Sequence, residues 1–363
     1  MLREVKLKNF KCFDQLTLPL KNVNMLTGIN GVGKSTVIQS ILLLRQSYLQ
    51  DRSLGGLSLN GKYVKLGNAQ DVLYEKAAEE LIGIGVSADE GDFCSSFRYI
   101  PDSDLLPMES ADPGKLESGI FGNRFSYLSA FRIEPLELYR IANEEEIVRR
   151  EFGNNGEFAL QYLSLFGNED VENQAVVLQD KLGASLANQT RAWMDRIAPG
   201  VAPQITLNPH LRTSEVRYEF IEGKEKTNSY KSMNVGFGIT YVLPLIIAIL
   251  SARRGDIIVV ENPEAHIHPA GQRMLGELIT RAGAGGVQLF VETHSDHILN
   301  GTRLAVKKGA IDESLVQLVF FYKDGADQYK HKYVAPKIYR DGRLDCWPEG
   351  FLDEWDKALY DLI

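Results

Sequence analysis

The sequence predicts an α/β fold in which a mixed sheet carries flanking helices and the middle of the chain forms a mainly helical insertion. Three observations predict it. Residues 22–50 read as a strand, a glycine-rich loop and a helix in direct succession. Residues 239–323 alternate between helices and apolar strands, as in a sheet with helices packed on its faces. Residues from about 155 to 197 show apolar side chains at helical spacing.

The N-terminal segment 1–76 is expected to form the first part of the head. EVKLKNFKCF and QLTLPL alternate apolar and polar residues as short strands do, and NVNMLTG reads as a third strand. TVIQSILLLRQSYLQ then has the spacing of a helix.

The middle segment 77–214 is predicted to contain strands followed by helices. LIGIGVSAD and FCSSFRYIP are expected to pair as antiparallel strands, whereas 101–118 is rich in Asp, Ser, Pro and Gly and reads as a loop. The helical block 155–197 includes NQAVVLQDKLGASL, and APGVAP closes it before strand-like alternation returns.

The last segment, 215–363, completes the predicted head. Its elements alternate along the chain in this order: a helix at 239–251, the strand DIIVVEN, a helix from about Ala270 to Ala282, the strand VQLFVETH, the helix DHILNGTRLAVKKG and the strand LVQLVFFYK.

Composition indicates a soluble, cytoplasmic protein. Of the 363 residues, 44% are hydrophobic and 24% charged, as in ordinary globular domains. The three cysteines are few and far apart, which argues against a disulfide framework or a cysteine-based zinc site. The most apolar run, at 239–250, is too short to span a bilayer, so we expect no membrane association. The net charge of −8 leaves room for a local basic groove, because binding depends on the patch and not on the sum.

GINGVGKST, residues 28–36, matches the phosphate-loop pattern of Gly, four residues and Gly-Lys-Ser/Thr. Glycines let backbone N–H groups approach phosphate oxygens, and the following helix N-terminus adds partial positive charge. Lys34 should reach the β- and γ-phosphates and Ser35 should ligate Mg²⁺. The expected nucleotide-binding residues are Asn30, Gly31, Val32, Gly33, Lys34, Ser35 and Thr36. The pattern therefore predicts a P-loop NTPase fold with ATP and Mg²⁺ as cofactors.

VVENPEAHIHP, residues 259–269, supplies the acidic half of such a site. A phosphate loop needs a carboxylate at the end of a buried strand to hold the Mg²⁺ shell, and Glu261 follows four apolar residues. The turn after it allows Glu264 to face the same cleft. From the residues alone, two interpretations of His266 and His268 stay open: a zinc site shared with Glu264, or histidines that only cap and pack the turn.

These motifs resemble the ABC-type ATPase heads of the SMC, RecF and OLD group. In that group the strand commonly ends Asp-Glu-Pro-Glu-x-His-Leu-His-Pro, so the resemblance gives Glu261 the Mg²⁺-associated position and Asn262 the position of the catalytic glutamate. Asparagine orients water but takes no proton from it. We expect Glu264, the nearest carboxylate, to act as the base. The alternative is slow hydrolysis, with ATP acting as a switch.

The resemblance also assigns roles to three further segments. His294, at the end of VQLFVETH, takes the position of the switch histidine that contacts the γ-phosphate and the attacking water, unless it is an ordinary strand-end histidine. Asn234, Gly236 and Gly238 loosely match the signature loop that caps the ATP of a second subunit, unless they form a closely packed turn. Gln70 is the candidate for the glutamine that approaches Mg²⁺, and otherwise a surface residue.

A narrower resemblance rests on YLSAFRIEP, ENPEAHIHPAGQ, ETHSDHILNG and DCWPEGFLDEWDKAL, which are similar to small stand-alone bacterial ATPases of the AAA_15 and AAA_21 type. Their genes often lie beside genome-defence and DNA-processing genes. The resemblance implies an ATPase that forms a head-to-head dimer on ATP and regulates or positions a separate effector protein, with double-stranded DNA as a candidate partner.

Two rival functions remain at this point. One is a nucleotide switch or DNA-binding structural module that hydrolyses slowly, which Asn262 favours. The other is a nuclease with a hidden site, for which the acidic stretches 144–146 and 101–104 are the only candidates, both read as solvated loops.

Overall fold

The structure, a computed structural model, describes residues 1–112, 119–122, 124–179, 182–223, 225–325 and 327–362. It divides into two compact units. The first unit comprises Met1–Phe125, Val316–Lys337 and Leu344–Ile363, and the second comprises Ser126–Leu315 and Ile338–Arg343. These boundaries fall at other residues than those of the three predicted segments.

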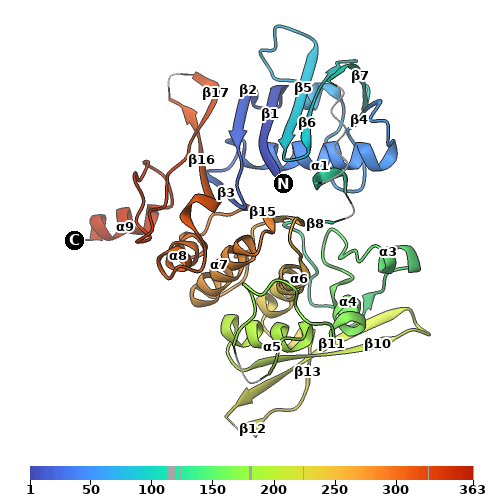
Figure 1. Ribbon diagram of the computed structural model, residues 1–363, viewed down its shortest axis with the longest axis vertical. Helices are drawn as coiled ribbons and strands as arrows, with labels where there is room; N and C mark the ends of the chain where they lie inside the picture. The colour runs from blue at the N-terminus through green and yellow to red at the C-terminus, as the bar shows by residue number, and fades with distance from the viewer. Residues whose placement is uncertain (113–118, 123, 180–181, 224, 326, 363) are drawn as a thin grey trace. The chain divides into compact units, whose positions relative to one another are not determined.

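A largely antiparallel sheet forms one layer of the first unit (Figure 1). Its strands, in spatial order, are β2 (Phe13–Pro19), β1 (Leu2–Phe10), β5 (Leu81–Ala88), β6 (Gly91–Arg98), β7 (Leu105–Asp112) and β4 (Gly56–Ser58). The predicted N-terminal strands and the antiparallel β5–β6 pair are confirmed. The loop predicted over 101–118 is wrong for β7, because Leu105–Asp112 pairs with both β6 and β4; residues 113–118 lie outside the described residues.

The phosphate-loop elements belong to the same unit. Strand β3 (Val23–Gly28) lies parallel to β16 (Val316–Asp324), which pairs antiparallel with β17 (Asp327–Val334). A strand from near the C-terminus thus supports the strand that leads into the glycine loop. The helices of this unit are α1 (Lys34–Gln50), α2 (Ala69–Val72), the 3-10 turn at Gly119–Phe121 and α9 (Glu354–Leu362).

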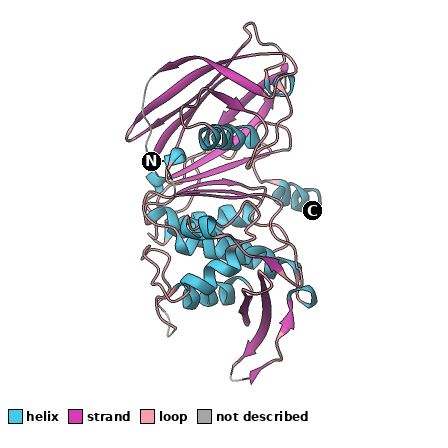
Figure 2. Ribbon diagram, turned by 90° about the vertical axis from the view of Figure 1, so that its right-hand side faces the viewer, coloured by secondary structure: helices cyan, strands magenta, loops and turns pink. Residues whose placement is uncertain are grey.

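Helices dominate the second unit, beside a small antiparallel sheet (Figure 2). They are α3 (Glu144–Val148), α4 (Ala159–Phe166), α5 (Leu186–Ile197), α6 (Phe237–Ser251), α7 (Pro269–Ala284) and α8 (Asp296–Lys307), with 3-10 turns at Ser232–Asn234 and Glu313–Leu315. The strands are β9 (Tyr139–Arg140), β10 (Val201–Asn208), β11 (Thr213–Glu222), β12 (Glu225–Lys226), β13 (Tyr230–Lys231), β14 (Ile257–Glu261) and β15 (Gln288–Glu292), and β8 (Phe125–Leu128) begins at the boundary of the two units.

The predicted alternation of helices and strands over 239–323 is confirmed, but the helix predicted over NQAVVLQDKLGASL is wrong. Apart from Leu186, which begins α5, its described residues form turns and irregular chain, because side chains of α5 satisfy the backbone there. Gln189 accepts the N–H of Leu178 and donates to its carbonyl oxygen, and the Trp193 indole donates to Val176. A second difference is that the acidic stretch 144–146, read as a loop, begins the short helix α3, which Asn143 caps.

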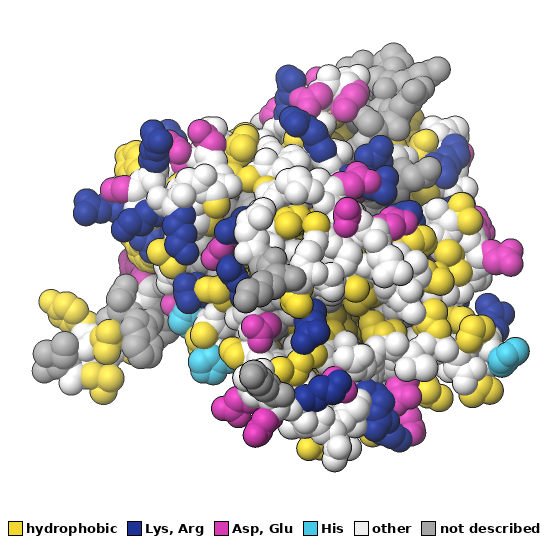
Figure 3. Space-filling view, turned by 60° about the horizontal axis from the view of Figure 1, so that its bottom comes forward, with side chains coloured by type: hydrophobic (Ala, Val, Ile, Leu, Met, Phe, Trp, Pro, Cys, Tyr) yellow, Lys and Arg dark blue, Asp and Glu magenta, His cyan; other side chains and the backbone are white. Residues whose placement is uncertain are grey.

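Strands β14 and β15 of the second unit pair in parallel and are buried along almost their whole length. Ile257–Val260 are all buried and end at Glu261, which lies in register with Glu292 on β15. Among the described helices none combines the length and apolar character needed to cross a membrane. The face drawn in Figure 3 mixes lysine and arginine with aspartate and glutamate side chains around hydrophobic ones.

Candidate functional site

The phosphate loop has the predicted order of strand, loop and helix. Strand β3 ends at Gly28, and α1 begins at Lys34 directly after Gly33. Gly33 has φ of 113°, and a Cβ there would lie 2.4 Å from Cζ of Phe13, so only glycine fits. The turn at Gly33 therefore leads directly into the N-terminus of α1, the end of a helix that attracts anions.

Lys34 lies folded back over the loop that precedes it. Its Nζ donates hydrogen bonds to the carbonyl oxygens of Gly28 (2.9 Å) and Ile29 (2.7 Å). Lys34 and Thr36 are buried, whereas Asn30 and Gly31 are exposed at the tip of the loop. The structure thus brings the predicted nucleotide-binding residues of 30–36 together in one loop and helix start.

His331 on β17 supports this loop and was missed by sequence reasoning. Its Nδ1 lies 3.0 Å from the carbonyl oxygen of Val32, so the hydrogen bond requires a proton on Nδ1. The imidazole also packs edge-on against Phe13. No sequence motif links the phosphate loop to His331, which lies 299 residues after Val32; the contact follows from the β3–β16–β17 pairing.

Gln70 lies exposed in the short helix α2. Both atoms of its amide are engaged by Asp102: Nε2 donates to Oδ1 (2.9 Å), and Oε1 accepts the Asp102 N–H (3.0 Å). This pairing closes the loop around 102 against α2. The Mg²⁺ role predicted for Gln70 stays a prediction.

Glu261, at the end of β14, is held by β8 and by the segment that follows it. Tyr127 donates its hydroxyl to one carboxylate oxygen (3.2 Å), and the Ala130 N–H bonds the other (3.2 Å). Burial raises the pKa of Glu261, against the lowering effect of the Ala130 and Tyr127 hydrogen bonds and of the nearby Arg132 cation. A divalent cation would favour the ionised form of this carboxylate.

The sequence motifs assign no role to Arg132, which lies in YLSAFRIEP, after β8. Its side chain is only 5% exposed. Nη1 donates to the carbonyl oxygen of Glu261 (2.8 Å), and Nη2 donates to that of Asn262 (2.6 Å). Burial lowers the pKa of Arg132 to about 10, which still leaves the guanidinium charged at neutral pH.

Asn262 adopts the left-handed conformation, with φ of 45°. Its N–H donates to the carbonyl oxygen of Glu292 (2.8 Å), which ties the turn to the end of β15. Its side-chain Oδ1 is buried and has no hydrogen-bond partner among the described residues.

Glu264 joins this turn to the predicted switch histidine. One carboxylate oxygen accepts the hydroxyl of Thr293 (2.8 Å), and the other accepts the backbone N–H of His294 (2.8 Å). Of the predicted catalytic residues, the structure therefore brings Glu264 and His294 into direct contact and places Asn262 in the same turn.

The signature-like loop begins α6. Asn234 ends a 3-10 turn, Gly236 precedes the first residue of the helix, and both are exposed. Gly238 packs against the turn after β14, since a Cβ there would lie 2.0 Å from the carbonyl oxygen of His266. The His266 ring also lies 4.5 Å from that of Phe237, so the loop and the acidic turn are in contact within this unit.

The two histidines of VVENPEAHIHP cap and pack. His268 is the N-cap of α7, where its Nδ1 accepts the N–H of Ala270 (3.2 Å), and His266 packs on the rings of Phe237 and Tyr241. This geometry favours the cap-and-pack interpretation. Over the described ranges, no group of three or more His, Cys, Asp or Glu side chains is arranged to hold a metal ion.

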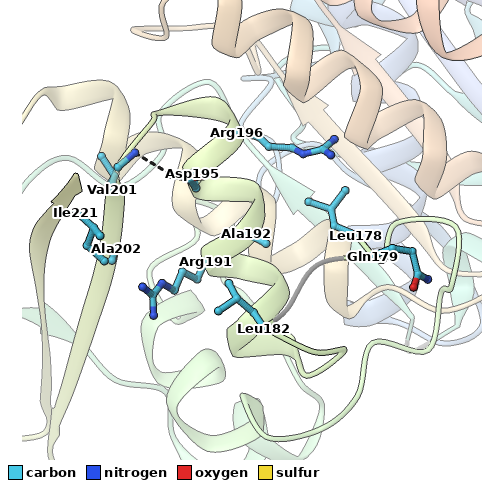
Figure 4. Close-up of a pocket in the computed structure, with 11 residues that line it drawn as sticks. Leu178, Gln179, Leu182, Arg191, Ala192, Asp195, Arg196, Val201, Ala202 and Ile221 are labelled. Atoms are coloured by element: carbon cyan, nitrogen blue, oxygen red, sulfur yellow. Dashed lines mark hydrogen bonds between the residues drawn. The ribbon is translucent and has the colours of Figure 1, made fainter. Parts of the chain in front are cut away.

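A pocket of about 410 Å³ lies elsewhere in the second unit, between α5 and the β10–β11 hairpin (Figure 4). Arg191 and Arg196 line it together with apolar side chains such as Leu178 and Val201. Asp195 at its edge accepts the N–H of Gly200 (2.8 Å). None of the predicted site residues lines this pocket.

Comparison with known proteins agrees with the family resemblance of the sequence motifs. Residues 23–300 match the family AAA_21, described as "AAA domain, putative AbiEii toxin, Type IV TA system", and residues 311–362 match DUF3696, described as a protein of unknown function. An OLD nuclease from Thermus scotoductus is 21% identical over 371 residues, which cover 95% of this chain and 68% of that protein.

Two solved structures are similar in fold at 14% identity. One is an SmcHead bound to the C-winged helix domain of ScpA, with a TM-score of 0.56 over 93% of this chain and 98% of that one. The other is an Smc head domain with an extended coiled coil, bound to the C-terminal domain of ScpA derived from Pyrococcus furiosus, with a TM-score of 0.53 over 99% of each chain. The predicted P-loop NTPase fold of the ABC-ATPase-head type is confirmed.

Proposed function

The chain belongs to the AAA_21 family of SMC- and OLD-like P-loop ATPases, and on that premise we propose that it binds Mg-ATP at the phosphate loop and hydrolyses it. The observation that carries the proposal is the strand–glycine loop–helix turn that ends at Lys34. In this proposal Lys34 moves from its two carbonyl partners to the β- and γ-phosphates, and Ser35 ligates Mg²⁺.

Glu261 is proposed as the acidic residue of the Mg²⁺ shell. Its position at the carboxyl end of the buried strand β14 supports this role. Mg²⁺ prefers oxygen ligands and keeps several waters, so one carboxylate beside a serine hydroxyl and phosphate oxygens is an adequate set.

Glu264 is proposed as the general base, with His294 and Asn262 orienting the water. Each carboxylate oxygen of Glu264 accepts one hydrogen bond from residues 293–294, and each has a second lone pair left to take a water proton. These bonds also fix the carboxylate, as a base acting on a positioned water requires.

ATP-dependent, head-to-head dimerisation is proposed because Asn234 and Gly236 are exposed at the N-terminus of α6, where a second subunit's phosphate would meet free N–H groups. An effector protein is proposed as the output, since the similar Smc heads are bound to ScpA in their structures. We place this activity in bacterial genome defence or DNA processing, with double-stranded DNA as a further candidate partner.

Steady-state turnover of Mg-ATP by the full chain tests the proposal, with Lys34→Ala as the inactive comparison. Turnover that disappears in Lys34→Ala supports it. Tight ATP binding without turnover would favour the nucleotide-switch alternative, and absence of ATP binding would overturn the assignment altogether.

Complementation tests the dimer separately. Lys34→Ala and Gly236→Glu should each be inactive alone. Mixed at equal amounts, they should recover about a quarter of wild-type turnover, because half of the dimers are mixed and each contains one intact composite site. No recovery from two folded variants would contradict the head-to-head arrangement.

A nuclease is the second candidate function, because the curated relative that matches 95% of this chain is named an OLD nuclease. Nicking of supercoiled plasmid in Mg²⁺ or Mn²⁺ tests it. Cleavage that survives in Lys34→Ala would identify a site independent of the phosphate loop.

A further inference from the structure

Arg132 is a buried cation whose partners are mostly backbone. The guanidinium donates to the carbonyl oxygens of Ser129 (3.3 Å), Glu261 (2.8 Å) and Asn262 (2.6 Å). Two of these carbonyls are consecutive and belong to the turn that carries the proposed Mg²⁺ ligand and leads to the proposed base. A planar fork of donors suits two adjacent acceptors, which a lysine ammonium does not match.

The same guanidinium stacks on an aromatic ring of α6. Its Cζ lies 4.1 Å from the centre of the Tyr241 ring, and the Tyr241 hydroxyl donates to the carbonyl oxygen of Ala130 (2.6 Å). Arg132 is thus held both by Tyr241 of α6 and by the loop after β8 to which Arg132 itself belongs.

Burying a cation is costly, and an apolar side chain of similar size would often fill such a space with equal or better stability. The hydrogen bonds of the guanidinium indicate why a charged side chain is present at this position. By holding the carbonyls of Glu261 and Asn262, Arg132 fixes the orientation of two successive peptide groups. These set the left-handed conformation of Asn262 and the direction in which the chain continues to Glu264.

We propose that Arg132 is a positioning residue for the ATPase reaction, which keeps Glu261 directed toward Mg²⁺ and Glu264 beside His294. The inference rests on the proposed function, since it gives Arg132 a role in that reaction. It assigns Arg132 no contact with nucleotide; its action passes through the backbone of residues 261 and 262.

The test compares Arg132→Gln and Arg132→Lys with Arg45→Gln. Arg45 is a matched control, because it is also 5% exposed, donates Nη1 to two carbonyl oxygens (Ile120, 2.6 Å; Gly122, 2.8 Å) and lies over an aromatic ring, that of Phe125. It lies eleven residues after Lys34 on α1, about 16 Å along the helix axis. Three quantities are measured for each folded variant: kcat, the affinity for ATP in EDTA, and the gain in that affinity on adding Mg²⁺.

Arg132→Gln should lower kcat by roughly 10²-fold, as expected for a displaced catalytic group, and should lose most of the Mg²⁺-dependent gain in ATP affinity. ATP affinity in EDTA should be unchanged, because the phosphate loop is intact. Arg132→Lys should recover little of the lost kcat or of the lost Mg²⁺-dependent gain. Arg45→Gln should retain wild-type kcat even if it lowers the melting temperature as much as Arg132→Gln does. If Arg132→Gln does not fold, Arg132→Lys provides the same readouts.

Arg132→Gln with wild-type kcat and Mg²⁺ gain would overturn the inference while the ATPase assignment stands. Equal losses in Arg45→Gln would overturn it too, by showing a general effect of destabilisation. If the wild-type protein binds ATP without hydrolysing it, the gain in ATP affinity on adding Mg²⁺ is the deciding measurement, and an unchanged gain in Arg132→Gln would overturn the inference. If wild type binds no ATP, the proposed function fails and the inference fails with it.

Discussion

Replacing Glu264 by glutamine should abolish ATP hydrolysis while leaving the fold and ATP binding nearly unchanged. In the wild-type structure the carboxylate accepts the Thr293 hydroxyl and the His294 N–H, both at 2.8 Å. A glutamine can keep both contacts. Its Oε1 accepts the His294 N–H, and its Nε2 donates to the Thr293 oxygen once that hydroxyl rotates.

The expected magnitudes follow from these two bonds. Hydrogen bonds to a charged group contribute about 1.5–3 kcal/mol each and neutral ones about half as much. Glu264→Gln should therefore cost about 1.5–3 kcal/mol of unfolding free energy, and Glu264→Ala, which loses both bonds, about 3–6 kcal/mol. Loss of a general base lowers kcat by roughly 10²–10⁴-fold.

Urea unfolding and steady-state turnover of both variants check these values side by side. A kcat loss in Glu264→Gln as large as that in Glu264→Ala, with a stability loss only about half as large, identifies a proton acceptor. A Glu264→Gln chain that turns over ATP within a few-fold of wild type would refute the assignment. The carboxylate would then serve only to hold residues 293 and 294, and Asn262 with His294 would have to orient the water.

Two further predictions concern stability. Gly238→Ala should lose about 1–3 kcal/mol in chemical unfolding, because its Cβ would lie 2.0 Å from the His266 carbonyl oxygen, whereas Gly236→Ala, whose nearest contact is at 3.9 Å, should lose less than about 1 kcal/mol. Burial raises the pKa of Glu261 above its unfolded value, so stability present at low pH is lost as pH rises through the folded pKa. Glu261→Gln carries no ionisable group there, so its unfolding free energy should rise relative to that of wild type as pH rises from acid to neutral. A difference in unfolding free energy between the two proteins that stays constant or falls with pH would contradict this reasoning.

The parts of the fold and site that sequence predicted are those with strong local patterns. The glycine loop, the apolar run before Glu261 and the run before His294 each combine a buried strand with a polar end, and such strands are specified by their own residues. The helix over 237–251 is similarly defined by its continuous apolar stretch.

The parts that sequence did not predict depend on contacts distant in the chain. His331 reaches the phosphate loop only because β17 pairs with β16 and β16 with β3. Residues 173–179 have helical spacing but take their hydrogen bonds from Gln189 and Trp193 on α5, so tertiary contacts override the local pattern. Arg132 lies in YLSAFRIEP, which resembles the family, yet nothing local shows that its guanidinium meets carbonyls about 130 residues away.

The asparagine in place of the group's catalytic glutamate has a physical account in the structure. At φ of 45°, asparagine is among the few non-glycine residues that adopt the conformation at low cost. Glu261 and Glu292 already lie in register at the ends of adjacent parallel strands. A glutamate at 262 would add a third carboxylate beside them, and like charges in a partly buried site disfavour one another's ionised forms. An amide at 262 avoids that repulsion, and Glu264, two residues further on, is left as the carboxylate of the turn that lies against His294.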